Sequence, residues 1–318
     1  MSIGISLIVL LAALLHASWN ALLRAGSDRL WSMTIMCVAI AIVCAGLAPF
    51  VPAPAKASWE YALLSALLHV GYNLFLVRTY RSGDLGQTYP ISRGSSPVLV
   101  SIGAMLFAGE FPDPIGAFGV MLVSGGIVSL ALQGRTIGWG SLPYALGTGC
   151  FIAAYSVTDG IGVRLSGSPI GYTVWMCLLW GVMAPPVYAV LRDWRSLVRD
   201  RRETAIAAGG GIVSLVAYGI VIFAMSWGPM ASVSALRETS VVFAALIGRI
   251  FLSERLTTWR IVACCVVALG AMLISHDGSA GHAAPAAHRS DLHWMRIGMQ
   301  SDPVAQQVLA NTAAARHS

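Results

Sequence analysis

Apolar stretches of about 20 residues follow one another along almost the whole chain, separated by short polar connections. A helix of about 20 apolar residues spans the hydrocarbon core of a bilayer, and inside lipid a helix satisfies its own backbone hydrogen bonds. The ten expected spans are residues 3–24, 31–51, 59–80, 87–108, 114–132, 141–164, 169–191, 204–226, 231–252 and 256–275. The sequence thus predicts an all-α integral membrane protein with ten transmembrane helices.

The composition excludes a soluble fold. Of the 318 residues, 57% are hydrophobic and 11% are charged, whereas soluble domains are about 25% charged. The net charge of +6 comes almost wholly from arginine, and Lys56 is the single lysine. A basic excess is typical of nucleic-acid binding, but it is also typical of the cytoplasmic loops of membrane proteins. In so apolar a chain we favour the second interpretation, so the lipid bilayer is an expected partner and nucleic acid is not.

The basic residues also predict an orientation. The loops after the first, third, fifth, seventh and ninth spans carry twelve arginines, whereas the loops on the other side carry only Lys56 and Arg164. The C-terminal tail adds three arginines to that second side. Because basic loops stay in the cytoplasm, this distribution places both termini outside it.

An interval of 144 residues relates the two halves of the chain. Three pairs of residues are separated by it: Arg93 and Arg237, Glu110 and Glu254, Gly126 and Gly270. In both copies a polar stretch with an arginine leads into an apolar helix, which ends at a small residue and a glutamate. Five spans per half is an odd number, so the two copies must have opposite orientations in the membrane. The pattern predicts an inverted-topology repeat, a construction of many secondary transporters.

The repeat defines the expected domain organisation. Residues 1–132 form the first five-helix repeat, 133–140 a connecting loop, 141–275 the second repeat and 276–318 a polar tail. The tail is rich in alanine, glycine, serine and histidine, without ligand-like spacing of the histidines, and we expect it to be disordered.

Three stretches carry a resemblance to a known family. They read LLHASWNALLR, TYPISRGSSPVLVSIGAMLFAGE and SVSALRETSVVFAALIGRIFLSE. Over about residues 3–275 the chain resembles the EamA-type members of the drug/metabolite transporter superfamily. The resemblance implies ten spans in two inverted five-helix repeats, transport of small metabolites, and a bacterial inner-membrane location. It also implies termini in the cytoplasm, in disagreement with the charge distribution.

Arg93 and Arg237 lie inside expected spans, where an ionisable side chain costs roughly 2.5–3.5 kcal/mol on insertion scales. Arg93 shares a helix face with Tyr89, and Arg237 is followed by Glu238. We expect both faces to border a central cavity between the repeats, where the arginines bind anionic groups. The alternative is that each arginine reaches a nearby surface or pairs locally, Arg237 with Glu238.

Further polar residues recur at a spacing of four. His16 and Asn20 stack on one helix face, as do His69 and Asn73, and Tyr155 and Asp159. They either line the cavity or join helices by hydrogen bonds. The predicted substrate-binding residues are Arg93, Arg237, Glu238, Asp159, Asn20, Asn73, Tyr72, Tyr89 and Trp19.

His16 is the candidate for proton coupling. It lies eight residues before Arg24. The resemblance implies a role here, because small four-helix relatives carry a proton-binding glutamate about eight residues before a basic residue. Histidine is the side chain whose ordinary pKa, about 6.5, lies near physiological pH. The alternative is a neutral His16 that bonds Asn20 or a neighbouring helix.

Glu110 and Glu254 each end an apolar helix just before the next helix begins. We expect them to stabilise turns and helix interfaces. Asp113, followed by Pro114, and Thr257 or Thr258 are the expected starts of the helices that follow.

Catalytic motifs do not occur in the sequence, which has no HExxH, no G-x-S-x-G and no P-loop. We therefore predict no enzyme, cofactor or metal, but a secondary active transporter that moves a small polar metabolite, such as an amino acid or related zwitterion. Its energy source would be protons or substrate exchange. The alternatives are a membrane-embedded enzyme acting on lipid and an accessory subunit without transport. A homodimer is compatible with the sequence.

Overall fold

The computed structural model describes residues 1–25, 28–82, 85–131, 140–193, 197, 200–251 and 257–277. The chain divides into a unit Met1–Ser279 and a unit Ala280–Ser318, and all described helices belong to the first. Residues 278–318 of the expected tail lie outside the described residues.

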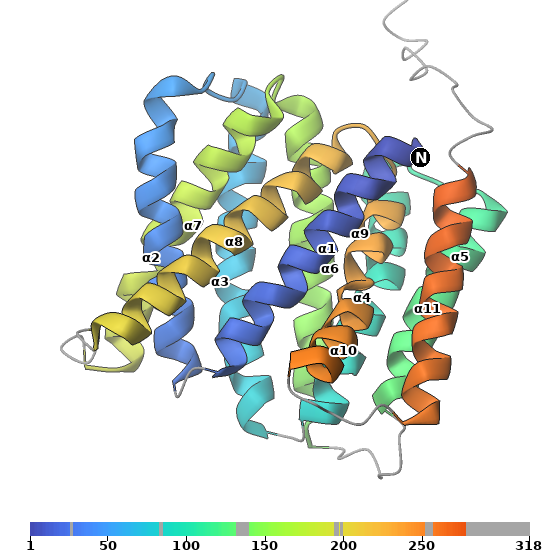
Figure 1. Ribbon diagram of the computed structural model, residues 1–318. Helices are drawn as coiled ribbons and strands as arrows, with labels where there is room; N and C mark the ends of the chain where they lie inside the picture. The colour runs from blue at the N-terminus through green and yellow to red at the C-terminus, as the bar shows by residue number, and fades with distance from the viewer. Residues whose placement is uncertain are drawn as a thin grey trace, which may run out of the picture. The chain divides into compact units, whose positions relative to one another are not determined.

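Regular structure in the described ranges is entirely helical, which confirms the all-α prediction (Figure 1). The helices are α1 (Ile3–Ala25), α2 (Arg29–Leu47), α3 (Trp59–Ser82), α4 (Leu85–Ala108), α5 (Pro114–Ala131), α6 (Leu142–Leu165), α7 (Pro169–Leu191), α8 (Arg201–Met225), α9 (Met230–Glu238), α10 (Ser240–Phe251) and α11 (Thr258–Asp277). Each of the ten expected spans coincides with one helix to within a few residues, except that the ninth consists of α9 and α10.

Eight helical segments of the described chain are long and apolar enough to cross a membrane, with α9 and α10 counted as one span. The other two long helices, α3 and α6, have 24 residues each but are more polar. They carry His69, Asn73 and Asp159, all buried. α3 packs along α6, and these polar groups face the interior of the bundle. The two helices are therefore less apolar than the others without being exposed to water.

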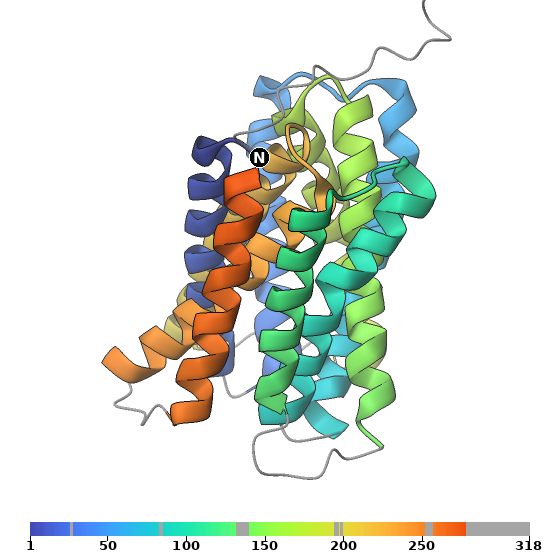
Figure 2. The same ribbon diagram turned by 90° about the vertical axis from the view of Figure 1, so that its right-hand side faces the viewer.

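The helices pack mainly in pairs that join the two halves of the chain. α1 packs on α8, α3 on α6, α2 on α7 and α5 on α11, and Figure 2 shows α11 beside α5. α5 begins at Pro114 and α11 at Thr258, which preserves the interval of 144 residues. The starts of these two helices agree with the interval found in the sequence, while the repeat and its domain boundaries stay a prediction.

Close approach of α5 and α11 depends on two glycines. A Cβ atom at Gly119 would lie 2.9 Å from the carbonyl oxygen of Gly270, and one at Gly270 would lie 2.8 Å from that of Gly119. Neither backbone leaves room for a side chain. Small residues at such crossings let transmembrane helices pack by van der Waals contact.

The ninth expected span is broken at Thr239, where α9 ends and α10 begins. The Thr239 hydroxyl donates to the carbonyl of Leu236 at 2.6 Å. Arg237 and Glu238 form the last turn of α9, so the break lies next to the charged residues. Discontinuous helices place ligand-binding groups at mid-membrane in many transporters.

The expected helix starts are confirmed. Asp113 Oδ1 accepts hydrogen bonds from the backbone amides of Ile115 and Gly116, both at 2.9 Å. Thr257 Oγ1 accepts from the amide of Arg260 at 3.3 Å. Glu254, which was expected to stabilise the preceding turn, lies outside the described residues.

The helix ends that flank the arginine-rich loops lie at one end of the bundle, at the bottom of Figure 1. They are the ends of α1, α3, α5, α7 and α10 and the beginnings of the helices that follow. The side of the membrane on which this end lies stays a prediction.

Candidate functional site

Two arginines share one carboxylate in the middle of the bundle. Arg93 of α4 and Arg237 of α9 are 2% and 1% exposed, and Glu238 is fully buried. Arg93 Nε lies 3.3 Å from Glu238 Oε2, and Arg237 Nη2 lies 3.0 Å from Glu238 Oε1. Arg237 Nε also donates to Oε1 at 3.1 Å. This charged cluster carries two positive charges and one negative charge, so one guanidinium charge is not neutralised within it.

The charged cluster has features of both interpretations of the sequence. Arg237 pairs with its neighbour Glu238, as the local alternative expected, but Arg93 from the other half of the chain reaches the same carboxylate. Tyr89 lies one turn before Arg93, and its ring centroid is 5.5 Å from the guanidinium carbon, within the range of a cation–π contact.

His16 of α1 joins this cluster. Its Nε2 atom lies in very close contact with Arg93 Nη2, and its Nδ1 atom faces the indole Nε1 of Trp19 at 3.2 Å. Both imidazole nitrogens therefore face hydrogen-bond donors, whereas neutral imidazole accepts at only one nitrogen. Asn20 donates to the backbone carbonyl of His16 at 2.8 Å.

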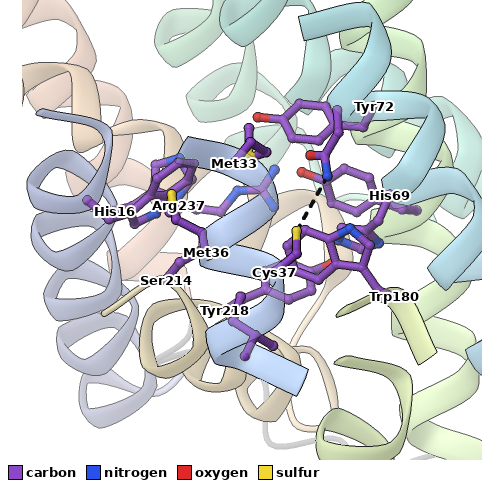
Figure 3. A pocket seen from close by; sticks show the side chains of 14 residues that line it. His16, Met33, Met36, Cys37, His69, Tyr72, Trp180, Ser214, Tyr218 and Arg237 are labelled. Atoms are coloured by element: carbon purple, nitrogen blue, oxygen red, sulfur yellow. Dashed lines mark hydrogen bonds between the residues drawn. The ribbon is translucent and has the colours of Figure 1, made fainter. Parts of the chain in front are cut away.

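A cavity of about 40 Å³ lies beside the charged cluster (Figure 3). Helices α1, α2, α3, α6, α7, α8 and α9 contribute to its wall. The lining residues are His16, Trp19, Met33, Met36, Cys37, Ile40, His69, Tyr72, Asn73, Tyr155, Trp180, Ser214, Tyr218 and Arg237. Since one water needs about 10–15 Å³ on this measure, the cavity has room for a few waters, and a metabolite requires the helices to move.

Aromatic rings form much of the cavity wall. His69 stacks on Tyr155 with ring centroids 4.0 Å apart and packs against Trp180 at 4.9 Å and Tyr218 at 5.2 Å. Tyr72 meets Tyr155 edge to face at 5.6 Å. His69 Nδ1 lies 2.9 Å from the carbonyl oxygen of Ser65, one turn earlier in α3. The rings are thus fixed by one another.

Asp159 forms a separate polar cluster with Tyr172 and Tyr218. The carboxylate is fully buried and accepts hydrogen bonds from the hydroxyls of Tyr172, at 2.9 Å, and Tyr218. Tyr218 lines the cavity, whereas Asp159 does not. Both carboxylate oxygens therefore have phenolic donors.

The structure brings most of the predicted site residues together. Five of them line the cavity: His16, Trp19, Tyr72, Asn73 and Arg237. Arg93, Glu238 and Tyr89 lie in the adjoining charged cluster, Asn20 bonds its own helix, and Asp159 lies behind Tyr218.

Sequence reasoning missed the cavity residues of α2, α7 and α8, notably Met33, Cys37, Trp180 and Tyr218. None of them is ionisable at neutral pH, so none shows the insertion cost that identified the arginines. From the sequence alone, an aromatic side chain that faces a cavity in a transmembrane helix cannot be distinguished from one that faces lipid or another helix.

Glu110 has the structural role expected of it. Its carboxylate forms an ion pair with Arg164 at the end of α6 and accepts a hydrogen bond from the Met230 amide, the first of α9, at 2.9 Å. Arg164 also donates to the carbonyls of Met225, at 3.0 Å, and Gly228, at 2.8 Å. One ion pair thus caps the end of α8 and the start of α9 together.

Replacing Arg164 by glutamine is expected to lower the free energy of unfolding by about 1–2 kcal/mol, because Glu110 loses its cation and two backbone carbonyls lose their donor. The value includes a discount for solvent screening, since the two side chains are 32% and 22% exposed. Denaturant unfolding in detergent measures it. The matched control is Arg192→Gln, whose pair with Asp28 spans 3.7 Å at the surface and should cost under about 0.5 kcal/mol. Equal losses in both variants would contradict the capping role.

The fold and the buried charges define a class: a multi-pass helical membrane protein with a polar cavity at the centre of its bundle. Residues 139–276 match the model of the EamA-like transporter family. This match confirms, over these residues, the predicted resemblance to EamA-type members of the drug/metabolite transporter superfamily.

A comparison of folds covers both halves of the chain. A solved structure titled "Crystal structure of protein" covers 86% of this chain and 98% of its own chain, with a TM-score of 0.71 and 19% sequence identity. At this identity the match concerns the fold alone. No curated protein matches the chain by sequence.

Proposed function

We propose that the protein is a secondary active transporter that moves a small polar metabolite by alternating access. The charged cluster carries the proposal: two arginines at corresponding positions of the two halves meet at one carboxylate, beside the cavity. A buried charge is costly unless it is paired or functional. Two arginines and one glutamate give the cluster a net positive charge, which suits an anionic group of the substrate.

An amino acid or related zwitterion suits this site. Its carboxylate would lie at Arg237, the arginine that lines the cavity. Its ammonium group would lie against the ring faces of residues such as Tyr72 and Trp19, which attract cations by their quadrupole. The predicted partners for a cationic group, Glu238 and Asp159, already hold arginines and tyrosines, so they would have to exchange partners to bind an ammonium group.

A membrane-embedded enzyme acting on lipid is the weaker alternative. Lipid head groups lie at the membrane interface, where such an enzyme needs its reactive groups. Here the charged cluster belongs to the interior of the bundle and to both halves of the chain. An accessory subunit would not require a charged group at corresponding positions in both halves.

Transport into proteoliposomes preloaded with unlabelled metabolites tests the proposal. With a panel of amino acids, hydroxy acids, amines and sugars, we expect uptake of one or a few labelled compounds against the same compound inside. Liposomes without protein and liposomes with Arg237→Ala protein are the controls. Absence of exchange for the whole panel in folded, correctly inserted protein would contradict the proposal.

His16 remains the predicted proton-coupling residue, and its test is a comparison of His16→Gln with the wild type over a range of pH. If His16 carries the coupled proton, the variant loses accumulation driven by a proton gradient and keeps substrate exchange, because glutamine keeps hydrogen bonding without titrating. Protonation of His16 must overcome the repulsion of Arg93 and the donor at Trp19. Unchanged proton-driven accumulation would exclude His16 and leave Asp159 and Glu238 as the next residues to test.

A further inference from the structure

Two buried polar atoms of the cavity wall have no hydrogen-bond partner among the described residues. They are the amide oxygen Oδ1 of Asn73 and the indole nitrogen Nε1 of Trp180. Both side chains are only 8% exposed. An unsatisfied buried donor or acceptor costs about 1–3 kcal/mol, and each such group in a native structure calls for an explanation.

Both side chains have contacts that favour the orientation seen in the structure. Asn73 donates from Nδ2 to Cys37 Sγ at 3.8 Å, which leaves Oδ1 as the free end of the amide. The Trp180 indole packs against His69 with ring centroids 4.9 Å apart, and His69 is itself stacked on Tyr155. Figure 3 shows Trp180, His69 and Cys37 around the same cavity. The two polar atoms are therefore held in place without a partner.

Arg237 adds a third group. Its Nε and Nη2 atoms contact Glu238 and Ser234, and the residue also lines the cavity. The cavity wall thus offers a cationic donor, a neutral donor and one neutral acceptor. Its lining includes no carboxylate.

We propose that Asn73 and Trp180 determine substrate specificity: when the helices move to admit a metabolite, the widened cavity takes a small carboxylate that carries a hydrogen-bond donor on the adjacent carbon, an α-amino or an α-hydroxy group. The carboxylate accepts hydrogen bonds from Arg237 and from the indole of Trp180. The α-substituent donates to the Asn73 oxygen. This inference rests on the proposed transport function and narrows its substrate class.

The discrimination against a carboxylate without the α-substituent follows from the same atoms. When such a molecule binds, the Asn73 oxygen stays buried without a donor. A penalty of about 1–3 kcal/mol corresponds to roughly a 5- to 150-fold weaker affinity. The α-amino and α-hydroxy forms both satisfy Asn73, so the site separates them much less from each other than from the unsubstituted acid.

The test uses the purified full chain in detergent and two matched series of probes: L-alanine, L-lactate and propionate, and L-phenylalanine, L-phenyllactate and 3-phenylpropionate. Thermal unfolding against probe concentration reports binding, because a ligand of the folded state raises the midpoint. In at least one series we expect the amino and hydroxy forms to bind at least about fivefold more tightly than the unsubstituted acid.

Three variants separate specificity from packing. Asn73→Leu keeps the side-chain volume and should bring the three members of the series to within about twofold of one another, through weaker binding of the substituted forms. Trp180→Phe should weaken all three by a similar factor, roughly five- to tenfold, and leave their order unchanged. Ser124→Ala removes a buried hydroxyl that also lacks a partner but lies on α5, outside the cavity. It should change neither the affinities nor the preference for the substituted acids.

Each other outcome contradicts the inference in a distinct way. Equal binding of substituted and unsubstituted acids by the wild type, or unchanged discrimination in Asn73→Leu, removes Asn73 from substrate recognition. If no carboxylate of either series binds, while an amine or sugar is exchanged in proteoliposomes, the substrate class is wrong and the transport function stands. If neither binding nor exchange occurs with any compound of the panel, the transport proposal fails as well.

Discussion

Replacing Glu238 by glutamine is expected to lower the free energy of unfolding by about 3–5 kcal/mol, the cost of breaking a buried ion pair by removing one partner. Glu238 is fully buried and is the carboxylate that contacts both Arg93 and Arg237. Its removal leaves two guanidinium groups without a counter-charge in the interior. Equilibrium unfolding of the purified protein, or its yield in the membrane if folding fails, measures the effect.

A second substitution tests whether the unbalanced charge causes this loss of stability. Glu238→Gln combined with Arg93→Gln restores the net charge of the cluster to +1, so the double variant should recover a large part of the lost stability. Glu60→Gln is the control, since Glu60 is an exposed carboxylate in the first turn of α3 and such surface changes stay within about 0.5 kcal/mol. A double variant less stable than Glu238→Gln would contradict the charge argument.

Replacing Arg237 by alanine is expected to reduce transport at least about 100-fold while the protein stays folded in the membrane. The loss corresponds to about 2.7 kcal/mol, within the range for removing one partner of a buried charge-assisted contact. The fold survives because Arg93 still pairs with Glu238 when Arg237 is absent. Lysine at position 237 should restore only part of the activity, because its ammonium group lacks the planar fork of donors.

Arg93→Ala provides the comparison. Arg93 does not line the cavity, but it contacts Glu238, which does not line it either, and the lining residue His16. It therefore acts on the substrate through the position of those groups, and its loss should reduce transport less than the loss of Arg237. Initial rates of transport over a range of substrate concentration compare the two variants. Normal transport by both alanine variants, at wild-type amounts of folded protein, would show that the arginines are structural.

The helices were predictable because a segment that spans lipid must be a helix of about 20 mostly apolar residues. The apolar stretches at 114–132 and 169–191, for example, coincide with α5 and α7. The break at Thr239 was not predicted, since α9 and α10 together read as one apolar span. No proline or glycine marks the break, and the local hydrogen bonds of Thr239 to Leu236 become evident only in the folded chain.

The candidate site was predictable only where a residue is costly to place in lipid. The cost of burying Arg93, Arg237 and Asp159 identified them without any structure. The cost does not say which groups neutralise one another, because the partners lie on different helices. Arg93 and Glu238, for instance, are separated by 145 residues along the chain.

By itself, the sequence determined that this chain lies in a membrane, that it forms helices of the observed lengths except in the ninth span, and that its two halves share a pattern at an interval of 144 residues. These properties follow from the apolar transfer energy and the backbone hydrogen bonds of each segment, which are local. Only the tertiary structure decided that Glu238 serves two arginines, that Asp159 is held by two tyrosines, and that Asn73 and Trp180 line one cavity. Those contacts depend on the rotation and crossing of packed helices, and residues far apart along the chain set both.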